Sequence, residues 1–249
     1  MKRLLLSLLV CSAAFISANS SNDKEVMPRD SFEIDMSVPV HIKSDWKWIN
    51  RYSEEIAGLK KRDLAVKDFT CDVLFVGSSS IRMWTTLQED MAPLKVVNRG
   101  YGGATVRDLL YNYNDVFSKY NPRKIVFYCD NDISGWKDAD LTVAQTFDIY
   151  RVFMEKVNKD YPGVPVYFLS LKFSRSRWQL KDKQHMLNVL MEEYATLNPN
   201  VTYVDVSSSF VDDNGQVIDE YFREDNLHLS KKGYAVWTSK LKPLLLKWK

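Results

Sequence analysis

Residues 71–81 read CDVLFVGSSSI, and this stretch decides the fold. The run VLFV is apolar without alternation, which indicates a strand covered on both of its faces. Gly77 then permits a tight turn, and the serines after it are typical of a helix N-terminus. A buried strand that turns directly into a helix is the unit from which layered α/β domains are built.

The same alternation continues along the chain. Short β-rich runs occupy Asp72–Gly77, Lys95–Asn98, Lys124–Cys129, Pro165–Leu171 and Thr202–Val206. Helical patterns cover about Thr105–Ser118, Leu141–Lys159, Lys181–Leu197 and Ser230–Lys247, and an earlier one, from Trp46 to Leu64, includes Trp48, Ile49, Tyr52, Ile56 and Leu59. We therefore predict a three-layer α/β/α sandwich around a five-stranded parallel sheet. Ligands bind such sheets outside the carboxyl ends of the strands.

Length and composition are those of an ordinary globular enzyme or binding domain. The 249 residues include 45% hydrophobic and 27% charged residues with a net charge of +2, so a single folded domain is expected. The basic residues are scattered among carboxylates, and this argues against a nucleic-acid partner. We expect the run Lys60–Arg62 to be a solvated helix end.

The N-terminus, MKRLLLSLLVCSAAFISANSS, has the layout of a secretory signal peptide. We assign residues 1–20 to this signal, 21–45 to a polar linker or strap, and 46–249 to the main domain. No other stretch approaches the about 20 apolar residues of a membrane span. We therefore expect a secreted or periplasmic protein without stable membrane insertion. Val10 before Cys11 is the wrong context for a lipoprotein anchor, so we do not expect lipidation.

Cys71 and Cys129 are the two cysteines beyond the predicted signal peptide. An exported protein could join them in a disulfide. The predicted strands, however, place them at opposite ends of neighbouring parallel strands, which is too far for disulfide geometry. Two buried free thiols are expected.

Residues suited to catalysis follow the first two predicted strands. The serines of GSSSI would face the crevice beside a helix N-terminus, either as nucleophile or simply as helix caps. In NRGYGGAT, residues 98–105, the N–H of Gly103 is a candidate oxyanion donor. The spacing is not G-x-G-x-x-G and no Lys-Ser or Lys-Thr pair follows, so we expect no dinucleotide or phosphate cofactor there.

Two further constellations lie later in the chain. Asn131, in CDND after the third strand, is a second candidate oxyanion donor, although Asp130 and Asp132 could instead be metal ligands. Such metal sites usually use several histidines, and this chain has three in all. His228 precedes the last helix with Asp225 three residues earlier, which suits a general base and its orienting acid. The alternative is a helix-entry aspartate and a satisfied loop histidine.

Together these stretches resemble the blocks of the SGNH (GDSL-type) hydrolase superfamily. GSSSI resembles its G-D-S-[LI] block, NRGYGGAT its N-x-G-x-x-G block, DND its G-x-N-D block and DNLHL its D-x-x-H block, in family order. The chain departs from the pattern at Ser78, where the family usually has Asp, and at Cys129, where it usually has Gly.

The resemblance implies a flavodoxin-like SGNH hydrolase fold and a serine esterase that needs no metal or cofactor. The nucleophile would be Ser79, with Ser78 and Ser80 as alternatives in the same run. His228 would be the base and Asp225 its orienting acid. The oxyanion hole would consist of the amides of Ser79 and Gly103 and the side chain of Asn131.

The substrate is expected to be a small-molecule or glycan ester with a short acyl group, most simply acetyl. Expected substrate contacts on the loops around the site are Arg82, Trp84, Tyr101, Lys172 and Arg177. Aromatic faces with arginine donors suit a sugar ring or an anionic headgroup. The alternatives are a lysophospholipase or thioesterase-type acylhydrolase, and a carbohydrate-binding protein that kept the fold without the chemistry.

Overall fold

The computed structural model describes residues 51–117, 119–135 and 140–247. The chain divides into two compact units, Met1–Asp45 and Trp46–Lys249, and every described residue belongs to the second. The expected signal peptide and linker, and the first residues of the helical pattern that begins at Trp46, lie outside the described residues.

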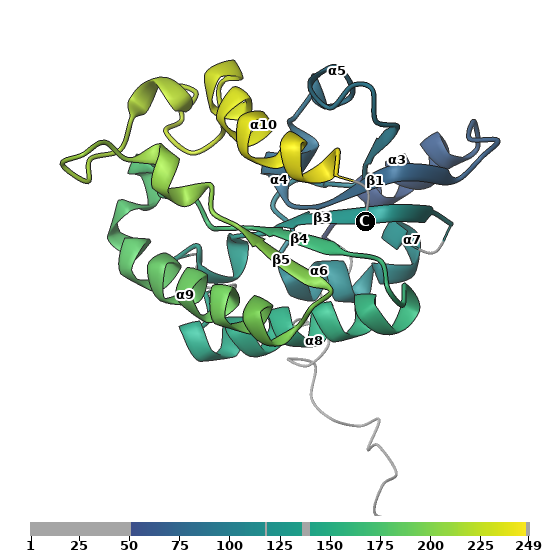
Figure 1. Ribbon diagram of the computed structural model, residues 1–249, viewed down its shortest axis with the longest axis horizontal. Coiled ribbons are helices and arrows are strands. Elements are labelled where there is room, and N and C mark those ends of the chain that lie inside the picture. Colours follow the sequence, from purple (N-terminus) through teal and green to yellow (C-terminus); the bar gives the residue numbers. More distant parts are fainter. Residues whose placement is uncertain (1–50, 118, 136–139, 248–249) are drawn as a thin grey trace, which may run out of the picture. The chain divides into compact units, whose positions relative to one another are not determined.

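The second unit is built on a five-stranded sheet in the order β2-β1-β3-β4-β5 (Figure 1). All four pairings are parallel. The strands are β1 (Thr70–Gly77), β2 (Val96–Asn98), β3 (Asn121–Tyr128), β4 (Val166–Leu169) and β5 (Val201–Val204). This confirms the predicted fold class, and the strand order is that of flavodoxin-like sheets.

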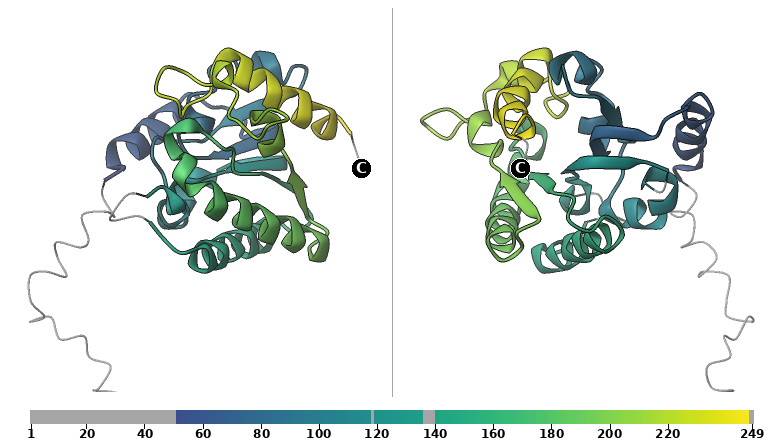
Figure 2. Two further views of the ribbon diagram at one scale, coloured as in Figure 1. Left: turned by 90° about the vertical axis from the view of Figure 1, so that its left-hand side faces the viewer. Right: turned by 45° about the vertical axis from the view of Figure 1, so that its right-hand side comes forward.

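Helices cover both faces of the sheet. The α-helices are α3 (Ser53–Asp63), α4 (Ser79–Arg82), α5 (Leu87–Asp90), α6 (Val106–Tyr111), α7 (Tyr113–Phe117), α8 (Val143–Asp160), α9 (Lys181–Leu197) and α10 (Lys231–Leu245). Short 3₁₀ helices are η2 (Asn131–Ile133), η3 (Arg175–Leu180), η4 (Ser207–Phe210) and η5 (Asp219–Tyr221). α10, α4 and α5 lie on one face, and α6, α8 and α9 lie on the other (Figures 1 and 2).

The helix expected over 105–118 is in fact two helices, α6 and α7, separated at Asn112. The Asn112 side-chain amide donates to the Asp108 carbonyl at 3.1 Å. Asparagine side chains that bond nearby carbonyls in this way compete with the helical hydrogen-bond ladder. The break therefore has a local cause that the apolar pattern does not reveal.

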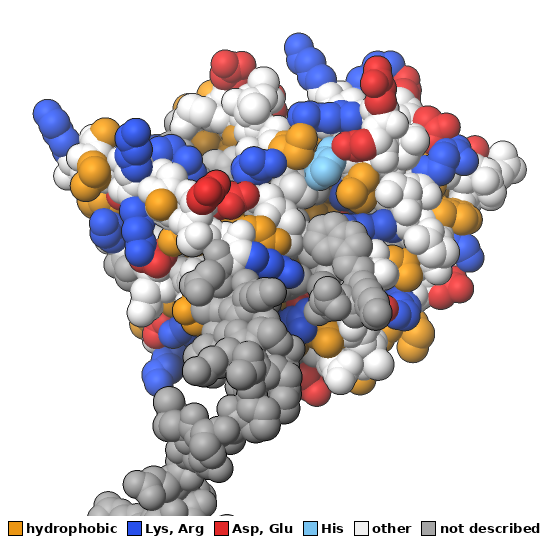
Figure 3. All heavy atoms as spheres, turned by 180° about the vertical axis from the view of Figure 1, so that it is seen from behind, with side chains coloured by type: hydrophobic (Ala, Val, Ile, Leu, Met, Phe, Trp, Pro, Cys, Tyr) orange, Lys and Arg blue, Asp and Glu red, His pale blue; other side chains and the backbone are white. Residues whose placement is uncertain are grey.

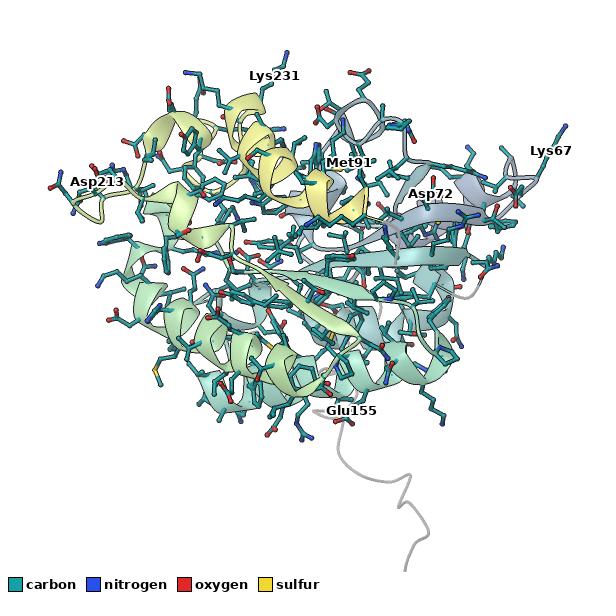
Figure 4. All side chains as sticks on the ribbon, viewed as in Figure 1. Lys67, Asp72, Met91, Glu155, Asp213 and Lys231 are labelled. Carbon is teal, nitrogen blue, oxygen red and sulfur yellow. The ribbon has the colours of Figure 1, made fainter. Side chains whose placement is uncertain are left out.

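Aromatic side chains form the core on both sides of β3. Tyr128 packs on Trp237 of α10 with ring centroids 4.8 Å apart, whereas Phe127 stacks on Phe153 of α8 at 4.4 Å. Successive strand residues face opposite sides of a sheet, so each helical layer receives one of the two rings. Figure 4 shows side chains filling both layers, with Glu155 pointing outward from α8. The continuous apolar strand runs thus reflect burial on two faces.

Cys71 and Cys129 are free and buried, as predicted. Cys71 lies near the amino end of β1, and Cys129 follows the carboxyl end of β3. Within the described ranges, no helix is both long and apolar enough to cross a bilayer. On the face shown in Figure 3, side chains of both charge signs are interspersed.

Candidate active site

The turn between β1 and α4 places three serines at the carboxyl edge of the sheet. Gly77 has φ 150°, and a Cβ there would lie 1.8 Å from the carbonyl oxygen of Tyr128. The Ser78 N–H donates to that same carbonyl at 3.0 Å. Only glycine permits this approach of β1 to β3, and α4 begins immediately afterwards at Ser79. The turn thus presents Ser79 to solvent while Ser78 and Ser80 stay buried.

Ser79, His228 and Asp225 form one hydrogen-bonded chain. The Ser79 Oγ lies 3.0 Å from His228 Nε2, and His228 Nδ1 lies 2.7 Å from Asp225 Oδ2. The Ser80 hydroxyl instead lies 3.4 Å from Lys172 Nζ, and the buried Ser78 hydroxyl has no hydrogen-bond partner. The structure therefore joins the predicted acid and base to the middle serine of the run.

A compact loop holds Asp225 against the imidazole. Asp225 Oδ1 accepts the backbone N–H groups of Leu227 and His228, each at 2.9 Å. Burial raises the pKa of Asp225, but the hydrogen bonds from His228 and Leu227 outweigh it and lower the pKa to about 2. A carboxylate that stays ionised can orient the imidazole and stabilise its cation when a proton arrives.

The loop of residues 98–103, here called the oxyanion loop, docks on α4, the helix that begins at Ser79. The Asn98 side chain donates to the Ile81 carbonyl at 2.6 Å and accepts the Gly100 N–H at 3.0 Å. A Cβ on Gly100 would lie 2.5 Å from the Arg82 nitrogen, so this backbone packs directly on the helix. The asparagine of the N-x-G block thus fastens the loop by hydrogen bonds, and the glycine allows the loop backbone to pack closely on α4.

Three N–H groups are available for an oxyanion. The backbone N–H groups of Ser79 and Gly103 donate to no acceptor in the part of the chain that is described. Asn131 Nδ2 donates one hydrogen to the Ala104 carbonyl at 2.8 Å, which leaves its second hydrogen free for a ligand. This arrangement suits stabilisation of a tetrahedral intermediate.

Asn131 is held from behind by a buried charge cluster of Asp130, Lys172 and Arg177. Arg177 Nη2 donates to Asn131 Oδ1 at 2.7 Å, and its Nη1 lies 2.8 Å from Asp130 Oδ2. Lys172 Nζ lies 3.6 Å from the same carboxylate oxygen. Burial raises the pKa of Asp130, but Arg177 and Lys172 lower it to about 2; burial lowers the pKa of Lys172. The guanidinium therefore fixes which way the Asn131 amide faces.

Four of the five expected substrate contacts are buried in the fold, and of these Trp84 also lines a hollow together with Asn98 and Gly100. Lys172 and Arg177 belong to the charge cluster. Trp84 is 1% exposed because it stacks on Tyr234 of α10, and Tyr101 is 1% exposed because it packs edge-on against Tyr52. Large side chains that follow the strands pack between the sheet and the helices and are therefore not exposed around the site.

Arg82 is the exposed member of that set. Its guanidinium lies against the oxyanion loop, since a Cβ on Gly102 would be 3.1 Å from Nη2.

Tyr52 lies next to the oxyanion loop, although no local sequence pattern identifies it as a site residue. Its hydroxyl would be 2.8 Å from a Cβ on Gly103, and this neighbour, 51 positions away in sequence, is set by the tertiary fold.

Asp130 and Asp132 do not fit the alternative of a metal site. Asp130 is paired with Arg177 and Lys172. Asp132 Oδ2 accepts the Val106 N–H at 2.7 Å, and its Oδ1 lies 3.4 Å from Arg107 Nε. Both carboxylates thus already face a cation inside the protein, which disfavours binding of a further cation. Among the described residues, no three His, Cys, Asp or Glu side chains gather in an arrangement that could hold a metal ion.

An open parallel sheet with a Ser–His–Asp chain and unpaired N–H donors at its carboxyl edge defines the class of α/β serine hydrolases. Residues 76–236, more than half of the chain, match the sequence profile of the GDSL-like lipase/acylhydrolase family. The chain belongs to this family, and it is an ester-hydrolysing acylhydrolase.

Similar proteins include enzymes named for acetyl esters. The platelet-activating factor acetylhydrolase IB subunit alpha2 of Rattus norvegicus is 25% identical over 82% of this chain and 86% of its own length. A Streptococcus pneumonia structure, provisionally described as a platelet activating factor, has a TM-score of 0.69 at 24% identity and covers 83% of this chain and 98% of its own. The structure of the acetylxylan esterase Axe2 of Geobacillus stearothermophilus has a TM-score of 0.55 at 13% identity. The match covers 71% of this chain and 94% of the Axe2 chain. At these low identities, the two structural similarities establish a shared fold.

Proposed function

We propose that this protein is an exported esterase that removes acetyl or other short acyl groups from the hydroxyls of a carbohydrate or a similar polar alcohol. The observation that carries the proposal is the hydrogen-bonded chain from Ser79 through His228 to Asp225. Ser79 would be the nucleophile, His228 the general base and Asp225 its orienting acid.

The reaction would proceed through an acyl-enzyme. Ser79 Oγ attacks the ester carbonyl while His228 Nε2 takes its proton, and the amides of Ser79 and Gly103 with the Asn131 side chain hold the oxyanion. The tetrahedral intermediate collapses as His228 returns the proton to the leaving alcohol. Water, activated by His228, then attacks the acyl-enzyme and releases the carboxylic acid.

Two lines support a short acyl group. The name of the curated relative specifies hydrolysis of an acetyl ester, and that of the Geobacillus neighbour specifies acetyl groups on xylan. The acyl part is the same in both names, whereas the alcohols differ. A carbohydrate alcohol is favoured for this chain by the expected export and by the exposed Arg82 beside the oxyanion loop.

Export rests on the signal-like residues 1–20. Expression of the full chain, cell fractionation and N-terminal sequencing of the product test it. Processing near residue 20 in an extracytoplasmic fraction supports the proposal, and an intact cytoplasmic chain contradicts it.

The nucleophile is tested with p-nitrophenyl acetate, butyrate and octanoate. Ser79→Ala should lower kcat by about a thousandfold or more. Ser78→Ala is the matched control, because the Ser78 hydroxyl makes no hydrogen bond and should be dispensable. Equal losses in both variants would overturn the assignment to Ser79.

The same esters distinguish the alternatives. Activity that peaks at acetate supports the short-acyl proposal, and acetate release from acetylated xylan or pectin would identify a carbohydrate alcohol. A peak at octanoate would favour a lysophospholipase or a related acylhydrolase. Glycan binding without hydrolysis of any ester would favour a binding protein.

A further inference from the structure

A hollow of about 340 Å³ lies beside the oxyanion loop, and no step of the proposed reaction uses it. Its lining residues include Arg62, Arg82, Thr85, Gln88, Asn98 and Gly100. We refer to it as the arginine hollow. Its volume is in the range of small-ligand pockets.

The arginine hollow carries an uncompensated positive charge. Arg62, in the last turn of α3, and Arg82, at the end of α4, both line it, and no aspartate or glutamate does. Neither guanidinium has an ion-pair or hydrogen-bond partner among residues 51–117, 119–135 and 140–247. Other cations near the site are neutralised, as Lys172 and Arg177 are by Asp130. Two such guanidiniums in one hollow are suited to bind a carboxylate, phosphate or sulfate group of a ligand.

The neutral amides of the hollow each donate one of their two hydrogens to a backbone carbonyl. Gln88 Nε2 donates to the Leu94 carbonyl at 2.9 Å, and Asn98 Nδ2 donates to the Ile81 carbonyl at 2.6 Å. The charged donors for a ligand are therefore the two guanidiniums, and the exposed Thr85 hydroxyl and the second hydrogens of the two amides are neutral donors beside them. This donor set favours a charged acceptor group over a neutral hydroxyl, because arginine has no acceptor atom to offer in return.

The arginine hollow shares Asn98, Gly100 and Arg82 with the surroundings of the proposed active site. Arg82 follows Ser79 by three positions on α4, a spacing that places Cβ atoms about 5–6 Å apart on one helix face. The Arg82 guanidinium also packs on Gly102, next to the proposed oxyanion donor Gly103. A group bound by Arg82 would therefore lie beside the oxyanion loop, on the same side as an ester held at Ser79.

We propose that the arginine hollow binds a carboxylate, phosphate or sulfate group carried by the alcohol part of the substrate, through the guanidiniums of Arg82, on the helix of Ser79, and Arg62. The natural substrate is then an acyl ester of an anionic alcohol, such as an acidic sugar. This inference rests on the proposed function, since it identifies the leaving group of the same reaction.

The test compares esters that differ in one charge. The pairs are para-acetoxybenzoate with para-acetoxybenzamide, and meta-acetoxybenzoate with meta-acetoxybenzamide. For each protein we would measure the ratio of kcat/KM for the anion to kcat/KM for its amide. The wild type should prefer the anion in at least one pair, and Arg82→Gln and Arg62→Gln should each lower that ratio about tenfold, the effect expected for one charge-assisted hydrogen bond.

The matched control is Lys67→Gln, which removes one positive charge just before β1, near the amino end of the strand (Figure 4). It should leave the ratio as in the wild type. A ratio that both arginine variants leave unchanged, or that Lys67→Gln lowers equally, would overturn the proposal.

Two further measurements distinguish a failure of this inference from a failure of the proposed esterase function. Calorimetric binding of para- and meta-hydroxybenzoate does not need catalysis, so weaker binding to Arg82→Gln than to wild type supports the hollow even if no ester is cleaved. Equal dissociation constants contradict it. Inhibition of amide-ester hydrolysis by inorganic sulfate, with no preference for the anionic esters, would assign the hollow to a free anion and overturn the role in substrate binding.

Discussion

At the scale of single residues, the oxyanion loop depends on Gly103. Its φ of 71° is a left-handed conformation that side chains rarely adopt, and an added Cβ would lie 2.8 Å from the Tyr52 hydroxyl. A methyl group here must displace either the phenol or the amide that faces the substrate. Gly103 therefore helps to set the position of one proposed oxyanion donor.

Gly103→Ala is expected to lower kcat about ten- to hundredfold, less than the about hundred- to thousandfold seen for complete loss of an oxyanion donor, because the amide is displaced and not removed. Gly163→Ala is the matched control, since Gly163 has a similar φ of 78° but nothing within 4 Å of an added Cβ. The control should lose some stability and keep its kcat. If both variants lose kcat equally, backbone strain alone explains the effect and the displacement of the amide does not.

Arg177 acts on the reaction through Asn131. Arg177→Met should lower both stability and kcat, because Asp130 loses its nearest cation and Asn131 Oδ1 loses its donor. Arg177→Lys should recover much of the stability but little of the kcat, since one ammonium group cannot reproduce the two-sided contact of a guanidinium. Thermal unfolding with kcat and KM on p-nitrophenyl acetate checks this. Full recovery of kcat by lysine would show that charge alone matters.

At the scale of elements, buried Arg99 joins three parts of the fold. It follows β2, its Nη1 lies 2.8 Å from Asp63 Oδ1 at the end of α3, and its Nε donates to the Val116 carbonyl of α7 at 3.1 Å. Tyr120 also donates its hydroxyl to Asp63 at 2.7 Å. The edge of the sheet nearest the oxyanion loop is thus fastened by a buried ion pair.

Arg99→Met should lower the free energy of unfolding by about 3–5 kcal/mol, because it leaves Asp63 buried without its cation. Arg151→Met is the control, since Arg151 forms exposed ion pairs with Asp148 and Glu155 on α8. That change should stay below about 1 kcal/mol. Urea unfolding of both variants checks the difference, and equal losses would contradict a structural role for the buried pair.

At the scale of the whole molecule, two carboxylates give opposite contributions to the pH dependence of stability. Burial raises the pKa of Asp132 from 3.8 to about 6, although the Val106 N–H and Arg107 partly oppose it. The folded state therefore holds this proton more tightly than the unfolded state, and the contribution to stability is lost as pH rises from about 4 through 6. Asp225, with its lowered pKa of about 2, contributes stability that is lost as pH falls from about 4 through 2.

Asp132→Asn should flatten the fall in unfolding free energy between pH 4 and 6, by up to about 3 kcal/mol. The asparagine can keep the acceptor for the Val106 N–H, since its amide oxygen can take the position of Oδ2. Urea titrations across this pH range check the prediction. An unchanged slope in the variant would show that another group is responsible.

Local patterns predicted much of this molecule. Apolar strand runs and helical periodicity led to the parallel sandwich. The polar blocks after the strands led to the serines of GSSSI and to Gly103, Asn131, Asp225 and His228, and the family resemblance then pointed to Ser79. These features were readable because strand and helix periodicity is local, and because parallel strands bring their following loops to one edge. The free thiols followed from the same strand positions.

Contacts between distant segments were decided by the tertiary structure alone. Trp84, Tyr101, Lys172 and Arg177 are buried and not exposed on the loops around the site. Packing between the layers depends on which side chains meet and not on residue type alone. Tyr52 reached the oxyanion loop, and Arg62 joined Arg82, through helix α3, whose docking no local pattern encodes. The amino-acid sequence indicated the reaction class and the edge of the sheet where it occurs, and its family resemblance pointed to Ser79. The hydrogen bond that joins His228 to Ser79 and not to its neighbours, and the charged surroundings of the site, depend on the folded chain.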